Sequence, residues 1–160
     1  MSKLEIRNLS LVNFRYFICV FYFWFFIFSL TGCGLGQHTY KQGEVTIGEQ
    51  KILVEVADTR PAIYKGLSGR ESLADNQGML FVFPKSDIYE FEMREMKFSL
   101  DIIWIHNNEI VEIWSNAPLP TDNYIPRYRP KGLANYVLEV NAGTAIKYGW
   151  RPGDKVSIGY

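Results

Sequence analysis

Short apolar runs, each bounded by turn-forming residues, recur along the chain from residue 44 to the C-terminus. In the first of them, residues 44–57, apolar and polar side chains alternate on both sides of Gly48, as in strands with one buried face. Residues 78–83 are apolar almost throughout, which predicts a strand buried on both faces. Asn107 and Asn108 separate two further runs and can adopt the left-handed conformation of a two-residue hairpin turn.

Two short helices are expected between these strands. Asp58 or Thr59 is a suitable N-cap, Pro61 falls in the first turn and Gly66 ends the segment. Residues 142–148, closed by Gly149, form the second helix. About seven short strands with regular turn signals predict a mainly β domain, namely a small antiparallel β-sandwich or barrel with two short helices.

The hairpin around the two asparagines also predicts a register. If His106 pairs with Glu109, one face holds Ile102, Trp104, Val111 and Ile113. The other face then holds Asp101, Glu112 and Trp114 among isoleucines. An unpaired carboxylate there would cost several kcal/mol, on the order of a broken buried ion pair. Asp101 is therefore expected to pair with Arg70 or Arg94.

The N-terminal segment has a different character from the rest. Residues 16–30 are fifteen residues without a charge, preceded by Lys3, Arg7 and Arg15. A spanning helix needs about 20 apolar residues, so this run has the length of a secretory signal core instead. The tetrapeptide that follows, Leu30-Thr31-Gly32-Cys33, resembles the lipobox of bacterial lipoproteins, which implies that Cys33 is lipidated and becomes the new N-terminus.

This interpretation divides the chain into a lipoprotein signal peptide (1–32), a flexible tether (33–43) and a single β-rich domain (44–160). It places the domain at the cell membrane, anchored by the lipid on Cys33 and facing the periplasm or the cell exterior. An uncleaved anchor helix with an incidental Cys33 is the alternative, and the basic residues before the apolar run put the domain outside in that case too.

Composition narrows the function classes. The whole chain has 17 basic and 17 acidic residues, and no sustained basic run is present, so a nucleic-acid partner is not expected. Cys19 lies in the signal core and Cys33 is the lipid site, which leaves the domain without a disulfide or a thiol nucleophile. His38 and His106 show no metal-ligand spacing, and no phosphate-binding loop occurs. We therefore expect no metal and no cofactor.

Several motifs occur in a fixed order: VADT, GLSGRESL, GMLFVFP, FEMREM, LDIIWI and YVLEV, then AG and GD. In this order they resemble the bacterial and archaeal domain of unknown function 192, over residues 54–155. The resemblance implies an antiparallel β fold with small helices that is often exported. It implies no reaction, because the family has no settled activity.

One motif departs from the family pattern. Members typically read Phe-Trp-Met-Lys-Asn-Thr where this chain reads FEMREM over residues 91–96. Met93 is kept and Arg94 retains the positive charge, whereas Glu92, Glu95 and Met96 replace the Trp, Asn and Thr. If the family binds a ligand through that amide and hydroxyl, this chain binds a different ligand or binds it differently.

Acidic residues gather on adjacent predicted strands: Glu90, Glu92, Glu95, Asp101 and Glu112. Glycoside hydrolysis uses two carboxyl groups about 5 to 10 Å apart with separated pKa values, so this cluster carries the hypothesis of an envelope glycan hydrolase. Acids at strand edges are also common solubility devices, which is the simpler explanation.

The preferred site is a ligand pocket rimmed by Arg70, Met93, Arg94, Glu95 and Asp101. The loop over residues 115–130 carries four of the seven prolines, and its Tyr124 and Arg127 offer a flat ring and a planar cation that suit sugars or extended peptides. The alternatives are a structural ion pair at Asp101 and a loop that only covers a sheet edge.

These observations predict a membrane-tethered extracytoplasmic lipoprotein. Its domain is expected to bind a small-molecule, glycan or protein partner of the cell envelope without catalysis. The glycan hydrolase with paired carboxylates is the alternative function.

Overall fold

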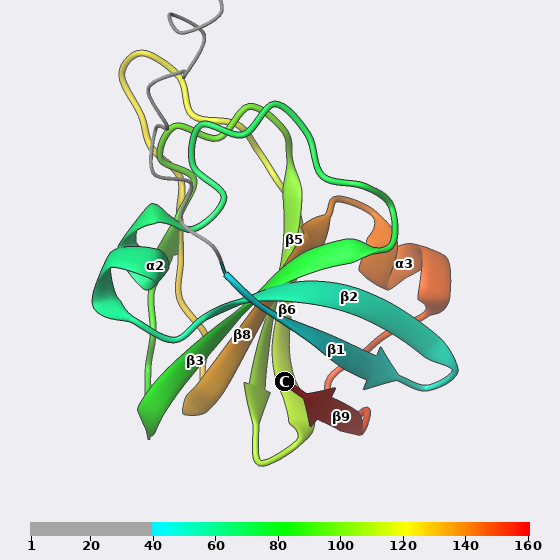
Figure 1. Ribbon diagram of the computed structural model, residues 1–160. Helices are drawn as coiled ribbons and strands as arrows, with labels where there is room; N and C mark the ends of the chain where they lie inside the picture. The colour runs from blue at the N-terminus through cyan, green and yellow to red at the C-terminus, as the bar shows by residue number, and fades with distance from the viewer. Residues whose placement is uncertain (1–39) are drawn as a thin grey trace, which may run out of the picture. The chain divides into compact units, whose positions relative to one another are not determined.

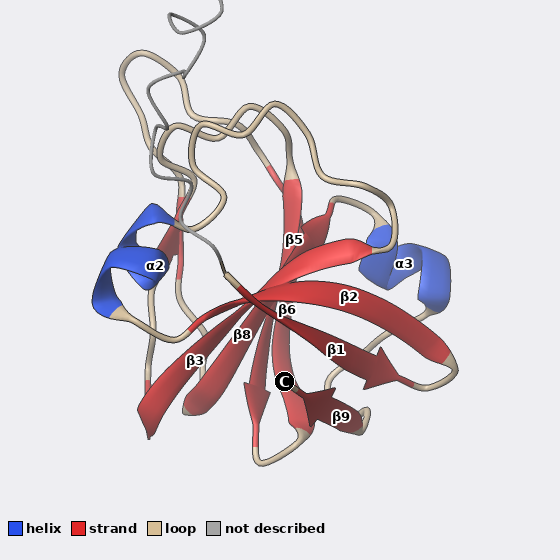
Figure 2. Ribbon diagram, in the orientation of Figure 1, coloured by secondary structure: helices blue, strands red, loops and turns tan. Residues whose placement is uncertain are grey.

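The computed structural model describes residues 40–160, which form a mainly β domain (Figures 1 and 2). The expected signal peptide, Cys33 and the tether as far as residue 39 lie outside the described residues. The first strand begins at Lys41, so the last three residues assigned to the tether belong to the folded domain.

Seven strands form one sheet in the order β6-β5-β8-β3-β2-β1-β9. Two further strands, β4 and β7, pair with each other, and two short helices, α2 and α3, complete the described part of the chain. The bounds are β1 Lys41–Ile47, β2 Gln50–Ala57, α2 Arg60–Lys65, β3 Gln77–Asp87, β4 Phe91–Glu92, β5 Leu100–His106, β6 Glu109–Ala117, β7 Arg127–Tyr128, β8 Ala134–Asn141, α3 Thr144–Tyr148 and β9 Val156–Gly159.

The predicted fold class is confirmed in outline, because the domain is mainly β with two short helices. The sheet curls, and its two edges approach each other where Glu109 bridges to Lys155. There the N–H of Ile110 donates to the carbonyl of Asp154 at 3.0 Å, and the N–H of Val156 donates to the carbonyl of Asn108 at 2.9 Å. The result is a half-barrel and not a sandwich of two sheets.

The prediction of a wholly antiparallel sheet was wrong for one pair, since β2 and β3 run parallel. The chain crosses from one strand to the other through α2 and the turn after it, and parallel neighbours require such a crossover. The helix itself begins as expected. The hydroxyl of Thr59 accepts from the N–H of Ala62 at 3.4 Å, and Gly66 ends the helix at a φ of 48°.

The central strands are buried on both faces, and each face has its own hydrophobic core. One core, inside the curl, includes Val54, Leu80, Ile103 and Leu138 and is covered by α3. The other, on the opposite face, includes Phe81, Trp104 and Val137 and is covered by α2 and the loops after it. The apolar run at residues 78–83 is thus explained, since most of its side chains are buried in one core or the other.

The β5–β6 hairpin has the expected turn. Asn107 and Asn108 have φ angles of 48° and 64°, and His106 pairs with Glu109. Beyond this pair, a bulge between Trp104 and Ile105 shifts the register. It carries Ile113 to the core inside the curl and places Glu112 opposite Trp104 and Trp114 opposite Ile102, so the faces predicted for these three residues were wrong.

The acidic residues predicted on adjacent strands are not all on strands, because Glu90 and Glu95 lie outside any strand. Within residues 89–96 only β4 is a strand, and Glu95 lies in a turn at a φ of 55°. The proline-rich loop over residues 115–130 includes strand β7, in which Tyr128 pairs with Phe91 and Arg127 with Glu92. A hairpin-like bridge between Thr121 and Tyr124 forms its tip.

Asp101 is fully buried, and its predicted pairing with Arg70 or Arg94 was wrong. Its carboxylate instead accepts three backbone N–H groups, from Asn116 at 2.8 Å, Gly143 at 3.1 Å and Ala145 at 2.8 Å. The bulge near the end of β6 and the first turn of α3 leave these donors without backbone partners, and the carboxylate satisfies them. Asp101 therefore ties β6 and α3 to β5.

We expect the Asp101→Asn substitution to lower the free energy of unfolding by about 2 to 3 kcal/mol, because an amide cannot accept at both ends and one N–H would then face an NH₂ group. Urea denaturation of the fragment 38–160, which contains both cores, measures this change. The control is Asp122→Asn at an exposed loop position, expected to stay within about 0.5 kcal/mol of the parent. A similarly small change for Asp101→Asn would contradict the role given to the carboxylate.

Candidate functional site

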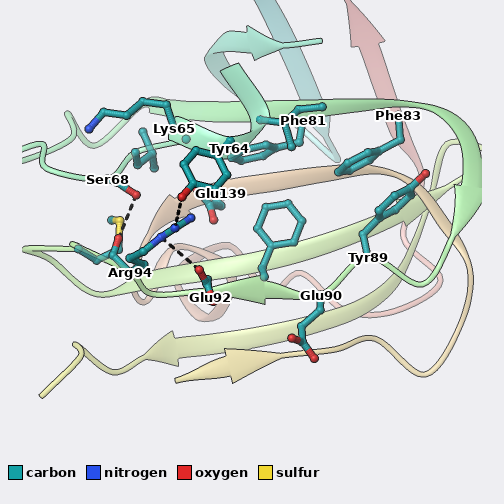
Figure 3. Close-up of a pocket in the computed structure, with 15 residues that line it drawn as sticks. Tyr64, Lys65, Ser68, Phe81, Phe83, Tyr89, Glu90, Glu92, Arg94 and Glu139 are labelled. Atoms are coloured by element: carbon teal, nitrogen blue, oxygen red, sulfur yellow. Dashed lines mark hydrogen bonds and ion pairs between the residues drawn. The ribbon is translucent and has the colours of Figure 1, made fainter. Parts of the chain in front are cut away.

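An open cavity of about 340 Å³ lies on the face of the sheet that α2 covers (Figure 3). Strands β3 and β8 supply residues of its floor, α2 and the following turn form one side, and the segment around β4 forms the other. Its lining combines aromatic, acidic and basic side chains: Ile63, Tyr64, Lys65, Gly66, Leu67, Ser68, Phe81, Phe83, Tyr89, Glu90, Phe91, Glu92, Arg94, Met96 and Glu139.

Four aromatic rings make a packed wall in this cavity. Phe83 stacks on Tyr89 with ring centroids 3.6 Å apart and planes inclined by 11°. Phe91 meets Phe81 edge to face at 4.8 Å. Because these rings hold one another in place, the wall offers a preformed apolar surface for a ligand.

Arg94 is fixed on the opposite side by several contacts. Its guanidinium lies 4.2 Å from the ring centroid of Tyr64 and donates to the hydroxyl of that tyrosine at 2.5 Å. The guanidinium also pairs with Glu92 at 3.1 Å. The backbone carbonyl of Arg94 accepts a hydrogen bond from the Ser68 hydroxyl at 2.9 Å. Arg127 holds the same Glu92 from the other side at 3.2 Å.

Glu139 lies on the floor of the cavity and is 6% exposed. Its neighbours on the adjacent strands are Met79 and Ile102. Within residues 40–160 the structure gives its carboxyl group neither a hydrogen bond nor an ion pair. Burial raises the pKa of Glu139 to about 8, so at neutral pH the group is mostly protonated.

The residues predicted from the sequence do not share one site. Arg94 lines the cavity, whereas Met93 is buried in the core beside it. Arg70 forms a two-bonded ion pair with Glu55, at 2.6 and 2.8 Å, away from the cavity lining. Glu95 is exposed, and its carbonyl accepts from the N–H of Gly69.

The remaining predicted residues divide in the same way. Asp101 serves the opposite core, as described above. Tyr124 is 65% exposed at the tip of its loop and does not line the cavity. Arg127 reaches the cavity rim through its ion pairs with Glu90 and Glu92. The structure thus joins Arg94 and Arg127 through Glu92 and separates both from Arg70 and Asp101.

Sequence reasoning missed Glu139, although a signal was present. In the run YVLEV it stands two residues after Val137, so period two puts it on the same buried face. A charged residue at such a position marks either a structural pair or a site. The ring wall gave no comparable signal, because its members are far apart in the sequence.

No group of three or more His, Cys, Asp or Glu side chains in residues 40–160 is arranged to hold a metal ion. No helix in that part of the chain is both long and apolar enough to span a bilayer.

Comparison with protein families identifies the domain. The family model DUF192, described as an uncharacterised ACR, matches residues 43–158. The chain belongs to the DUF192 family. The match extends the resemblance seen in the motifs to almost the whole described part of the chain. No curated protein matches this DUF192 chain.

Two solved structures are similar to the DUF192 domain. A protein from Sinorhizobium meliloti, described provisionally as a transcription regulator, is 29% identical, with a TM-score of 0.69 over 77% of this chain and 98% of its own. A protein of unknown function from Novosphingobium aromaticivorans is 31% identical, with a TM-score of 0.64 over 78% of this chain and 89% of its own. Since these matches span nearly all of both solved chains, a domain of this extent folds by itself.

Two of the three departures from the family pattern fall at the cavity. Of the three positions in the FEMREM segment that differ from the typical DUF192 motif, Glu92 and Met96 line the cavity and Glu95 does not. Glu92 holds both Arg94 and Arg127, so the substituted position organises the charged side of the site.

The raised pKa of Glu139 makes stability depend on pH. Between the ordinary pKa of 4.5 and the folded value of about 8, the folded state keeps a proton that the unfolded state releases. The free energy of unfolding therefore falls as pH rises, by up to about 1.4 kcal/mol per pH unit from this group. The Glu139→Gln variant lacks this contribution. The free energy of unfolding of the parent minus that of the variant should therefore fall with that slope from about pH 5 to 7.5.

Urea denaturation of both proteins across this pH range measures the difference. Glu49→Gln is the matched control, since it removes a carboxyl group from an exposed turn instead of the cavity. A difference between parent and Glu139→Gln that does not change with pH would show that Glu139 is not an isolated buried acid.

Proposed function

We propose that this DUF192 domain is a non-catalytic binding module of the cell envelope that takes a small ligand, or one residue of a polymer, into the cavity above Glu139. The observation that carries the proposal is a buried carboxyl group with no protein partner in the described chain, facing an open cavity with a wall of rings. Ligand sites are typically concave and apolar with few polar groups that orient the ligand.

The charged and titratable groups around the cavity differ in whether they have a protein partner. Arg94, Glu92 and Arg127 satisfy one another, so they set the shape of the charged side without needing a ligand. Glu139 is different, because its side chain is buried at the cavity floor and its carboxyl group pairs with no protein group in residues 40–160. A ligand that reached it would supply that partner.

The proposal includes attachment to the membrane through Cys33. It is supported by the uncharged leader, the lipobox-like Leu30-Thr31-Gly32-Cys33 and the start of β1 at Lys41. Residues 34–40 can extend at most about 25 Å, so a lipid on Cys33 would keep the domain near the bilayer surface. The ligand would then be one available at that surface, and the ring wall suits a sugar ring or another flat group.

One observation favours the competing function, a hydrolase of envelope glycans. Glu90, Glu92 and Glu139 line the same cavity in different environments, and a glutamic acid with its pKa raised by burial is suited to act as a general acid. Against it, Glu90 and Glu92 are both held by Arg127, which weakens either as a nucleophile or base. Mass spectrometry of peptidoglycan fragments after incubation with the domain would detect cleavage, which Glu139→Gln would abolish.

Binding can be tested by thermal shift of the fragment 38–160 against sugars and peptidoglycan fragments. A ligand at 100 times its Kd stabilises the folded state by about 2.7 kcal/mol, enough to raise the melting temperature by several degrees. Tyr64→Ala should weaken binding at least tenfold, because it removes a lining ring and the support of Arg94.

Ile146→Ala is the control for that variant. Ile146 is as exposed as Tyr64, 67% against 70%, but lies on α3, which covers the other core. Its substitution should leave the affinity unchanged. The proposal fails if no compound stabilises the fragment, or if both variants weaken binding equally.

Attachment is tested separately in the full chain expressed in bacteria. Cys33→Ser should abolish incorporation of labelled fatty acid and release the protein from the membrane fraction after cleavage of the leader, or leave it as an unprocessed precursor. Cys19→Ser is the matched control and should leave labelling unchanged. Labelling that persists in Cys33→Ser would disprove lipidation at this residue.

A further inference from the structure

We infer that the ligand of this cavity carries a protonated amine on an apolar body, and that Glu139 is the group that meets the amine. The inference rests on the proposed function, because it specifies the chemistry of the ligand bound there. It follows from the pairing of the charges in the cavity, from the nature of its walls and from the place of Glu139 in the sheet.

Most charges that line the cavity pair with one another. Arg94 pairs with Glu92, and Arg127 pairs with both Glu90 and Glu92. Lys65 is exposed at the end of α2, and Figure 3 shows its ammonium group directed away from the other lining residues. Within the described chain, Glu139 is therefore the lining acid that no cation meets. A ligand cation would complete its pairing.

The walls of the cavity are largely aromatic. Phe81, Phe83, Tyr89 and Phe91 present aromatic rings in the same space, and the faces of such rings attract cations. The cavity already holds one cation in this way, since the guanidinium of Arg94 lies 4.2 Å from the centroid of Tyr64. An anionic ligand would meet the faces of the same rings unfavourably.

No group near Glu139 in the described chain neutralises it. Its strand neighbours, Met79 on β3 and Ile102 on β5, do not titrate. The titratable and charged groups that line the cavity with it are Tyr64 and Lys65 of α2, Tyr89, Glu90 and Glu92 at and before β4, and Arg94 after it. With no cation contributing to its environment, burial alone keeps the free carboxyl group protonated. Arrival of an amine supplies the missing cation, so Glu139 ionises and releases its proton to solvent.

A matched pair of probes tests the inference. 2-Phenylethylamine and 2-phenylethanol have the same apolar body and differ in the cationic group. Titration calorimetry with the fragment 38–160 at pH 6.5 should give an affinity at least tenfold higher for the amine. Repeating the titration in buffers of different ionisation enthalpy should show release of nearly one proton per amine bound and none for the alcohol.

Glu139→Gln keeps the shape of the side chain and cannot ionise. It should lower the affinity for the amine at least tenfold and abolish proton release, while the affinity for the alcohol stays within about twofold. Circular dichroism of the variant confirms that it is folded. Glu49→Gln is the control and should bind the amine as the parent does.

Three outcomes would overturn the inference: equal affinities for the two probes, amine binding that Glu139→Gln does not weaken, or binding of neither probe. Equal affinities that Tyr64→Ala lowers would leave the cavity as a ligand site without selectivity for cations. Binding of neither probe would reject the amine, and the thermal-shift screen would then decide the proposed function by itself.

Discussion

The fold depends on burying both faces of three central strands. Strands β3, β5 and β8 carry apolar side chains on each face, so the sheet must be covered twice. Curling of the sheet and α3 cover one face. The other receives α2, the turn after it and the β4–β7 pair, which are short and irregular elements. Irregular elements cover a sheet less completely than a second sheet would, and the cavity remains between them.

Two buried acids on opposite faces show how differently such a sheet can treat a carboxyl group. Asp101 accepts three backbone N–H groups and holds the ends of β6 and α3 in place. Glu139 has no comparable donors, because its neighbours across the strands are Met79 and Ile102, whose backbone groups serve the sheet. The three hydrogen bonds of Asp101 give its carboxylate a structural role. Glu139, which borders an open cavity and has no protein partner in residues 40–160, is the basis of the proposed ligand site.

The charged side of the cavity is where this chain differs from the usual motif of the family. Glu92 replaces the typical tryptophan and bonds to Arg94 and Arg127, so an aromatic position has become the centre of an ion-pair network. The arginines belong to segments that lie far apart in the sequence, and the β4–β7 pairing brings them together.

Local pattern alone was sufficient for the features that depend on neighbouring residues. These include the mainly β class, the start of α2 at a cap of Asp58 or Thr59, its end at Gly66, the asparagine turn after His106 and the double burial of residues 78–83. Alternation and turn chemistry act over a few residues, so they can be read directly. The β-bulges in β6, the parallel pairing of β2 and β3 and the partners of Asp101 depended on contacts between distant segments, which only the tertiary structure decided. The cavity belongs to that second group, because its rings and its isolated Glu139 become neighbours only when the loops fold back over the sheet.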